Sequence, residues 1–473
     1  MGDERIVAVV LAAGAGSRFG GGKLLASIDG RPVLQHVLDR LVAGGVAETV
    51  VVLGEDAETL ERTIEWGTAH RVRNPDPSRG LSSSLAVGVG ALDEAVTGAL
   101  IALGDQPMLP VDVVQALLAA AGTADATRLI VVPVYHDDRG RNPVLLRRAA
   151  FGLVGEATGD RGLGPVIAAH RELVLEIAVE GVNPDVDTRA DLVGLLEATW
   201  AARVRENREQ VDRFREVPDG ADFYAPVTSL FRADPTRTDE PALEVLRDHV
   251  RHGETWLDIG AGAGRYALPI AMALEPSGGS VIALDPSAGM LEALQEIAAD
   301  FAIENVSVVV DRWPPKDIGA FEADVSLIAH VGYDIEAIGP FIRAMEAATS
   351  RLCIATLMER QPSSIADVCW PPVHGEERVA LPALPEFVEL LRAMGREPDV
   401  VRLEREPRRF GDRDELEGFL RRQLWIEPGG EKDHRFQAAL DELVETDDQG
   451  RIGLRGQRPL PTGIVTWAPD RGR

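Results

Sequence analysis

The sequence has few cysteines and no long apolar run. Cys353 and Cys369 are its two cysteines, which excludes a disulfide framework and leaves no paired spacing for a zinc site. No apolar stretch approaches the ~20 residues that a membrane span needs. The opening residues MGDERIVAVVLAAG lack the basic lead and cleavage-site pattern of an export signal. We therefore expect a cytoplasmic protein without a membrane segment.

Positive charge is also scarce. Lysine and arginine together number 49 against 76 acidic residues, which gives a formal net charge of −27. A surface of that sign repels a phosphate backbone and argues against non-specific nucleic-acid binding. Lysine occurs only at Lys23, Lys316 and Lys432. Lys23 lies in a glycine-rich stretch, where either a compact ammonium is needed or the lysine is retained by chance.

The order of apolar segments predicts two α/β domains. At 473 residues the chain exceeds the size at which a single hydrophobic core usually stops growing, so two domains are the first expectation and three the second. Apolar, β-branched runs alternate with helical periodicity in each half, as in doubly wound, mostly parallel Rossmann-like sheets. A charged helical pattern at 195–214 separates the halves, so we expect domains at 1–198 and 220–473 with a helical linker at 199–219. The expected strands are 5–13, 48–54, 70–75, 98–107, 128–135, 254–260, 280–286, 305–311, 323–330, 351–356 and 463–469.

The glycine-rich stretch LAAGAGSRFGGGKLL, residues 11–25, follows the first expected strand. Glycines let a backbone fold closely around a ligand and direct its N–H groups at phosphate oxygens. The stretch is not a P-loop, because Ser17 stands where the first glycine is needed and Leu24 follows the lysine. It is not a dinucleotide fingerprint either, because Phe19 takes the third glycine position. A purely structural turn is the alternative to a phosphate-binding loop.

Acidic residues are placed to accompany this loop. Asp105, in the GDQP segment, lies where a buried strand ends, and Asp185 or Asp187 offers a second carboxylate. Two carboxylates that hold a divalent ion, together with cations that neutralise a leaving pyrophosphate, are what nucleotidyl transfer needs. Arg18 as a surface cation and Asp187 as a helix cap are the structural alternatives.

Five segments resemble, in order, the nucleotidyltransferases of molybdenum cofactor maturation over residues 4–198. They are LAAGAGSRFGGGKLL, RNPDPSRGLSSSL, LGDQP, RGRNPVLL and DVDTRADL. Ala13 and GDQP favour the molybdenum cofactor cytidylyltransferases, which join CMP from CTP to molybdopterin and release pyrophosphate. This resemblance implies molybdopterin as a substrate and a molybdenum hydroxylase as recipient of the finished cofactor.

The same resemblance implies roles for individual residues. Leu11, Ala12, Ala13 and Gly14 would border the nucleotide, Arg18 and Lys23 would contact its phosphates, and Asp105 and Asp187 would hold Mg²⁺. Lys23, Arg18 and Asp105 are thus the expected catalytic residues. Ser82, in GLSSSL, either binds substrate or caps a helix. Asn142 departs from the family pattern, because many cytidylyltransferases have histidine there, and the acceptor therefore stays open.

A second glycine turn opens the second half. ETWLDIGAGAGRYALPIA reads as strand, turn and helix, and Asp285 ends the next strand 21 residues after Gly264. A ligand can approach the backbone closely at Gly260 and Gly262, and a carboxylate after the second strand can accept both hydroxyls of a ribose. These features suit an adenosine-containing cofactor and would also suit NAD.

The second half resembles the class I methyltransferases that use S-adenosylmethionine, over about residues 220–356. This resemblance implies a cofactor site made by Asp258, Gly260, Gly262, Gly264, Asp285, Asp311 and Arg312. Methyl transfer requires positioning more than a base, so the methyl acceptor cannot be identified from these motifs. His330 and Tyr333 follow the fourth strand of this half and either act on the acceptor or only shape the pocket.

The sequence therefore predicts a fusion of a magnesium-dependent nucleotidyltransferase with a methyltransferase. Three alternatives remain. The second half is a non-catalytic module that binds S-adenosylmethionine or its product, or it is an NAD-binding oxidoreductase, or the first half acts on another phosphate acceptor.

Overall fold

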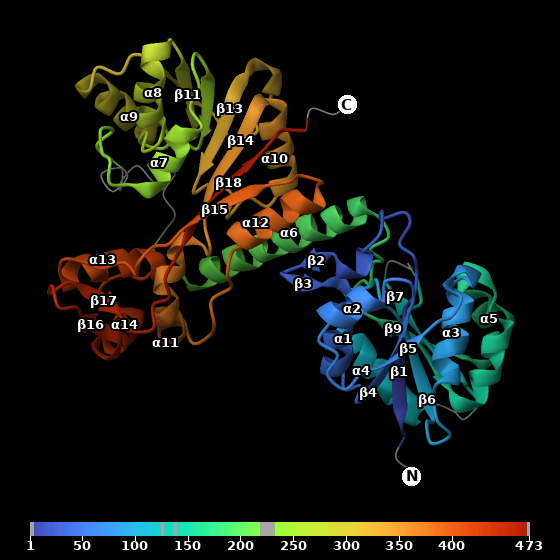
Figure 1. The fold of residues 1–473 in the computed structure, drawn as a ribbon. Helices are drawn as coiled ribbons and strands as arrows, with labels where there is room; N and C mark the ends of the chain where they lie inside the picture. Colours follow the sequence, from blue (N-terminus) through green and yellow to red (C-terminus); the bar gives the residue numbers. More distant parts are fainter. Residues whose placement is uncertain (1–3, 124–126, 137–139, 218–231, 471–473) are drawn as a thin grey trace. The chain divides into compact units, whose positions relative to one another are not determined.

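The computed structural model describes residues 4–123, 127–136, 140–217 and 232–470. The chain divides into two compact units, Met1–Gly194 and Leu195–Arg473. Each unit is built on a seven-stranded, mostly parallel sheet with helices on both faces (Figure 1). The expected fold class, two Rossmann-like α/β domains in tandem, is confirmed. The expected end of the linker at 219 and start of the second domain at 220 lie outside the described residues.

The sheet of the first unit has its earliest strand near its centre. Its strands, in sheet order, are β5 (His70–Arg73), β4 (Glu48–Leu53), β1 (Ile6–Ala12), β6 (Gly98–Leu103), β8 (Val144–Arg147), β7 (Ile130–Tyr135) and β9 (Val174–Val179). Neighbouring strands run parallel except at β8, which is antiparallel to both β6 and β7. The order of the strands reverses at β1, since the chain passes to β4 on one side and later to β6 on the other.

Helices cover both faces of this sheet (Figure 1). On one face lie α1 (Val33–Ala43), α2 (Ala57–Thr63) and α4 (Val111–Thr123), and on the other lie α3 (Leu81–Gly90) and α5 (Gly164–Ala169). Successive residues of β1 enter opposite cores, Ala8 and Val10 in one and Val9 in the other. This explains why β1 is apolar throughout. A short hairpin, β2 (Ser27–Ile28) and β3 (Arg31–Pro32), follows the glycine-rich stretch.

Helix α6 (Arg189–Phe214) contains the helix expected at 195–214. From Leu195 onward the helix belongs to the second unit, and side chains of that part bond to loops of the same unit. Trp200 donates its indole N–H to the Ile335 carbonyl at 3.0 Å, and Gln210 donates to the Glu377 carbonyl at 2.8 Å. These bonds satisfy polar groups that would otherwise be buried without partners.

The second unit repeats the doubly wound plan. Its strands, in sheet order, are β12 (Val306–Val310), β11 (Ser280–Asp285), β10 (Thr255–Ile259), β13 (Ala323–Ala329), β14 (Thr349–Met358), β18 (Thr462–Trp467) and β15 (Asp399–Leu403). β18 is antiparallel to β14 and β15. The helices around this sheet are α7 (Pro241–Asp248), α8 (Ala267–Leu274), α9 (Ala288–Asp300), α10 (Ile338–Ala347) and α12 (Leu384–Ala393). Within the described ranges, no helix combines the length and the apolar character needed to cross a bilayer.

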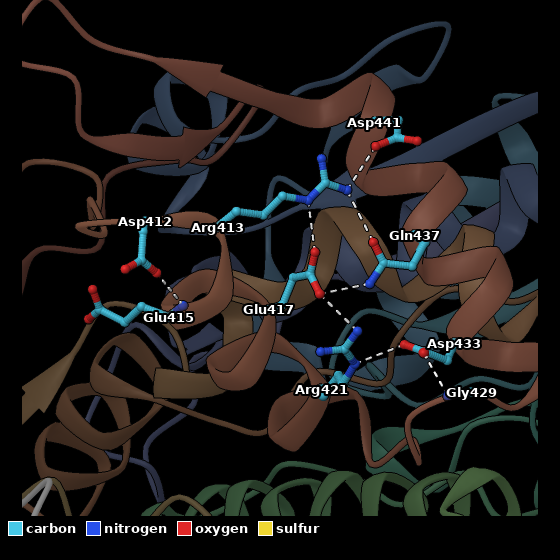
Figure 2. Close-up of polar contacts among 9 residues, drawn as sticks. All are labelled: Asp412, Arg413, Glu415, Glu417, Arg421, Gly429, Asp433, Gln437 and Asp441. Atoms are coloured by element: carbon cyan, nitrogen blue, oxygen red, sulfur yellow. Dashed lines mark hydrogen bonds and ion pairs between the residues drawn. The ribbon is translucent and has the colours of Figure 1, made fainter.

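A helical subdomain with its own core belongs to the second unit. It comprises α11 (Trp370–His374), α13 (Arg413–Leu424), α14 (Glu431–Leu443) and the hairpin of β16 (Val444–Thr446) and β17 (Ile452–Leu454). Figure 2 shows the polar network that joins α13 to α14. Glu417 accepts hydrogen bonds from Arg413, Arg421 and Gln437, each at 2.8 Å. One largely buried carboxylate thus links both helices.

Candidate active site

The glycine-rich stretch leaves β1 at the position where the strand order of the first sheet reverses. In doubly wound sheets the crevice at that position, outside the carboxyl ends of the strands, is the usual ligand site. The amides of Phe19, Gly20 and Gly21 all donate to the Gly16 carbonyl, at 3.0, 3.1 and 3.2 Å. Gly20 and Gly21 have φ angles of 92° and 93°, which side chains rarely adopt. The glycines are therefore required by the tight turn.

Gly14 and Ala15 are exposed and Gly16 is half-buried, and the amides of these three residues donate to no acceptor in the part of the chain that the structure describes. Consecutive unpaired N–H groups form a concavity suited to an anion. Leu11 and Ala12, at the end of β1, and Ala13, just after it, are buried. Because their side chains are buried, these three residues would contact a bound nucleotide through their backbone atoms. Gly14 is exposed.

Two cations and two carboxylates meet beneath the loop. Lys23 Nζ is bonded to the Asp105 carboxylate and lies 3.3 Å from Asp187 Oδ1. Arg18 Nη2 lies 2.9 Å from Asp187 Oδ2. The side chain of Lys23 is 11% exposed and that of Asp105 is 18% exposed, so water screens their interaction only weakly. The structure therefore brings together all four residues that the sequence singled out for the phosphate and metal chemistry.

The charges around Lys23 keep it protonated. Burial lowers the pKa of Lys23, but the charges and hydrogen bonds of Asp105 and Asp187 outweigh burial and raise that pKa above its usual value. Asp187 does not cap α6: the Thr188 hydroxyl oxygen takes that role, because it accepts from the amide of Asp191 at 3.2 Å. The Asp187 carboxylate is thus engaged with cations.

The carboxylates fit a divalent ion held together with a substrate. Among the described residues, no three histidine, cysteine, aspartate or glutamate side chains form a metal-binding group. Asp105 and Asp187 nevertheless converge on one cation, the Lys23 ammonium. Mg²⁺ is commonly held by one or two carboxylates, with phosphate and water oxygens completing its shell. Two hard carboxylate oxygen donors that converge on one cation match that pattern.

No sequence motif indicated the series of hydrogen-bonded side-chain amides that reaches Asp185. Gln106 Nε2 donates to Asp185 Oδ1 at 2.9 Å, Asn183 Nδ2 donates to Gln106 Oε1 at 3.0 Å, and Asn183 Nδ2 also lies 3.3 Å from the Asn142 carbonyl oxygen. Burial, followed by the charge of Asp105, raises the pKa of Asp185 to about 6. Their position was the only sequence signal for these two residues. Gln106 directly follows Asp105, and Asn183 lies two residues before Asp185.

Ser82 lies in the first turn of α3 and is half-buried. Its neighbours support the fold, because Asn74 Nδ2 donates to Ser83 Oγ at 2.8 Å and to Ser84 Oγ at 3.0 Å. No comparable bond involves the Ser82 hydroxyl within the described residues.

The second unit has its own glycine turn at its own point of strand-order reversal, between β10 and β13. Gly260 and Gly264 have φ angles of 79° and 80°. A Cβ at Gly260 would lie 2.5 Å from Val331 Cγ2, and one at Gly264 would lie 2.8 Å from Leu294 Cγ. A Cβ at Gly262 would meet nothing within 4 Å. Gly260 and Gly264 thus serve packing, and Gly262 is the glycine with open space beside it.

The acids expected around this turn lie together. Asp285 accepts from the amide of Gly262 at 2.9 Å and from that of Ser287 at 2.8 Å. Asp258 is 3% exposed, and its Oδ1 has no hydrogen-bond partner among the described residues. Burial, followed by the charge of Asp285, raises the pKa of Asp258 to about 7. Asp311 and Arg312 are exposed just after β12, and the Asp311 amide lies 3.3 Å from the Asp285 carbonyl oxygen.

The structure separates the roles of His330 and Tyr333. Tyr333 is buried, and its hydroxyl accepts from the amide of Met358 at 2.6 Å, which makes it a support for β14. His330 has a φ angle of 58°, and its buried Nδ1 lacks a partner in the described part of the chain. Burial, followed by the charge of Arg405, lowers the pKa of His330 to about 4. The imidazole is therefore neutral at pH 7.

Fold and sequence family together define the first unit as a nucleotidyltransferase domain. The chain belongs to the family described as MobA-like NTP transferase domain, whose sequence profile matches residues 8–173.

Three similar proteins illustrate the relationship. Nicotine blue oxidoreductase of Paenarthrobacter nicotinovorans is 30% identical over 204 residues, which are 40% of this chain and 96% of that protein. Bifunctional protein GlmU of Exiguobacterium sibiricum is 30% identical over 133 residues, which are 28% of this chain and 29% of GlmU. This chain therefore spans less than a third of GlmU. The crystal structure of Rv0371c from Mycobacterium tuberculosis H37Rv has 29% identity and a TM-score of 0.37, over 41% of this chain and 98% of that one.

Proposed function

We propose that the first unit transfers CMP from CTP to the phosphate of molybdopterin and releases pyrophosphate. The observation that carries this proposal is the meeting of Lys23 with Asp105 and Asp187 beneath a glycine turn that has unpaired amides. The choice of cytidine as the base and of molybdopterin as the acceptor depends on the resemblance of the first half to the cytidylyltransferases. A molybdenum hydroxylase would then receive the product.

The proposed reaction is an in-line displacement. An oxygen of the acceptor phosphate forms a bond to the α-phosphorus of the nucleotide, and the bond from that phosphorus to the bridging oxygen breaks, so pyrophosphate leaves with the electron pair. The amides of residues 14–16, with Lys23 and Arg18, would hold the phosphates and offset the charge that grows on the leaving group. Their placement on a fixed turn means that little reorganisation is needed.

Asp105 and Asp187 would hold Mg²⁺ on the nucleotide side of the crevice. The ion, when bound, supplies Lewis-acid charge to the phosphate oxygens. Lys23 would then be free to pair with phosphate in place of one carboxylate.

Pyrophosphate release tests this proposal. The full chain is incubated with Mg²⁺, molybdopterin and each of CTP, GTP, ATP and UTP in turn. We expect release with CTP to be at least about tenfold faster than with any other nucleotide, since a base-specific pocket discriminates by 1.4 kcal/mol or more. Pyrophosphate release with CTP and a different phosphate compound, but not with molybdopterin, would contradict molybdopterin as the acceptor. Because one relative is named an oxidoreductase, a nicotinamide-dependent reduction without pyrophosphate release would overturn the whole proposal.

For the second unit, we infer binding of S-adenosylmethionine and methyl transfer to an acceptor not yet identified. Three features support this: the open space at Gly262, the carboxylate of Asp285 beside it, and the position of both at the strand-order reversal. The unpartnered Nδ1 of the neutral His330 imidazole, on the loop after β13, would orient the acceptor.

Calorimetry with S-adenosylmethionine, S-adenosylhomocysteine and NAD distinguishes the alternatives. We expect both adenosyl ligands to bind the full chain and NAD not to bind. In an Asp285→Asn variant we expect binding weakened by about tenfold or more, because a charge-assisted bond to ribose is lost. Asp324→Asn, at the opposite end of this sheet, serves as the control. Binding of NAD alone would favour the oxidoreductase, and adenosyl binding without methyl transfer to any extract component would favour a non-catalytic module.

A further inference from the structure

The two carboxylates of the candidate metal site are carried by very different segments. Asp105 lies two residues after the end of β6, the middle strand of the first sheet. Asp187 lies in the loop 180–188, between the last residue of β9 and the first of α6. Mg²⁺ requires ligand oxygens at about 2.0–2.1 Å in near-ideal octahedral positions. A site shared by these two carboxylates therefore needs contacts that fix the loop against the end of β6.

Gln106 makes these contacts with its side chain. It is 5% exposed. Its Nε2 donates to Asp185 Oδ1 at 2.9 Å and to the Asn183 carbonyl at 3.3 Å. Its Oε1 accepts from Asn183 Nδ2 at 3.0 Å. One buried side chain thus forms three hydrogen bonds to the loop, in surroundings where water competes only weakly for them.

The same contacts decide which aspartate faces the reaction centre. Asp185 and Asp187 are two residues apart. Gln106 binds the first, and the Lys23 ammonium lies 3.3 Å from the second. The main chain between them is fixed as well, because the amide of Val186 donates at 2.9 Å to the carbonyl of the residue before Gln106. Gln106 therefore holds the loop in the register that places Asp187 beside the ammonium.

The support behind Gln106 reaches back to the sheet. Asn183 is 8% exposed, and its Nδ2 also donates to the Asn142 carbonyl at 3.3 Å. That carbonyl accepts from the hydroxyl of Tyr135, the last residue of β7, at 2.7 Å. The loop is thus connected by hydrogen bonds to the ends of two strands, β6 and β7.

We propose that Gln106 is a positioning residue of the metal site: it fixes the loop 180–188 so that Asp105 and Asp187 can bind one divalent ion. The role of that ion in catalysis rests on the proposed nucleotidyl transfer, whereas its binding can be measured separately. Gln106 acts through the loop and supplies no ligand itself. Residues that orient metal ligands in this way typically account for about 10–100-fold in metal affinity.

Mn²⁺ binding tests this role without any reaction. Mn²⁺, a paramagnetic probe for the Mg²⁺ site, is titrated into the full chain with and without CTP, and the free ion is measured by electron paramagnetic resonance. Binding that Asp105→Asn abolishes defines the site. In Gln106→Met, which nearly keeps the length of the side chain and removes its three bonds, we expect the Kd of this site to rise by about tenfold or more. Asn183 Nδ2 keeps the Asn142 carbonyl as acceptor, so the variant should fold.

Gln35→Met is the matched control. Gln35, on α1, is 4% exposed, and its Nε2 donates to Asp39 Oδ1 at 3.0 Å and to the Glu65 carbonyl at 3.3 Å. It therefore has the same pattern of bonds as Gln106, with partners that do not belong to the site. We expect Gln35→Met to leave the Kd for Mn²⁺ unchanged. Equal Kd values in Gln106→Met and Gln35→Met, or Mn²⁺ binding that does not depend on Asp105, would overturn the proposal.

Kinetics separate positioning from a purely structural role. In the pyrophosphate assay, Gln106→Met should raise the half-saturating Mg²⁺ concentration by about tenfold, with the rate at saturating Mg²⁺ within about threefold of the unchanged chain. A variant that is only less stable would lose rate at every Mg²⁺ concentration and keep its half-saturation, which would contradict positioning. If the unchanged chain releases no pyrophosphate, the transfer reaction fails, and weaker Mn²⁺ binding in Gln106→Met still supports the role of Gln106.

Discussion

Asp105→Asn is expected to reduce pyrophosphate release by the first unit by a factor on the order of 10³, because it removes a carboxylate charge where a metal and a triphosphate must be held. The variant should still fold. Lys23 keeps Asp187 as an ion partner at 3.3 Å, so no buried charge loses its only counter-ion. S-adenosylmethionine binding should be unchanged, because Asp285 and the glycine turn belong to the other sheet.

The measurement is initial-rate pyrophosphate release with CTP, Mg²⁺ and molybdopterin, together with calorimetry of the second unit's ligand in the same preparation. Asp112→Asn, an exposed position on α4, is the matched control and should keep the rate of the unchanged chain. If Asp105→Asn retained more than half of the rate, Asp105 would be a structural partner of Lys23 only. A parallel loss of adenosylmethionine binding would contradict independent sites.

Arg396→Met is expected to destabilise the second unit by about 3–5 kcal/mol, the usual result of breaking a buried ion pair from one side. Glu346 is 2% exposed and accepts from Arg396 Nε at 2.6 Å and from Arg396 Nη2 at 2.7 Å. It also accepts from the indole of Trp467, on β18, at 2.9 Å. Without Arg396, the Glu346 carboxylate must remain charged with one neutral donor or become protonated, and both cost free energy.

Denaturant unfolding followed by tryptophan fluorescence measures this loss, because six of the seven tryptophans, all but Trp66, lie in the second unit. Arg205→Met is the control. Arg205 is 51% exposed, and Glu336 keeps Arg208 at 2.7 Å, so we expect a change below about 0.5 kcal/mol. Replacing Glu346 as well, in an Arg396→Met and Glu346→Met double variant, should recover much of the stability, since no buried charge remains. If Arg396→Met alone lowered the free energy of unfolding by less than about 1 kcal/mol, the Glu346–Arg396 ion pair would not be a major source of stability in the second unit.

The strands nearest the candidate sites were predictable because they are buried on both faces. Continuous apolar runs such as residues 5–13 and 280–286 have few structural alternatives, and both form strands, β1 and β11. β8 and β9 were missed. β8 has four residues, and β9 alternates exposed and half-buried positions at the edge of its sheet. Short or edge strands carry too weak a periodicity to separate them from loops.

In the candidate sites, too, some features were predictable from the sequence and others were not. Each glycine turn with the acid after a neighbouring strand was predictable, since strand ends in a parallel sheet share one edge. The role of Asp185 was not predictable: Asp185 and Asp187 are equivalent in sequence, and only the fold directs one to Gln106 and the other to Lys23.

The sequence alone therefore determined that two doubly wound α/β domains follow one another, and that glycine turns and acids lie at the carboxyl ends of their strands. These features are local, because they follow from hydrophobic burial and from backbone angles that only glycine adopts readily. Tertiary structure alone decided which charges meet: Lys23 with Asp105, 82 residues apart, and Glu346 with Arg396, 50 residues apart. Electrostatic partnership depends on distance in space and on exclusion of water, and neither is written in the order of residues.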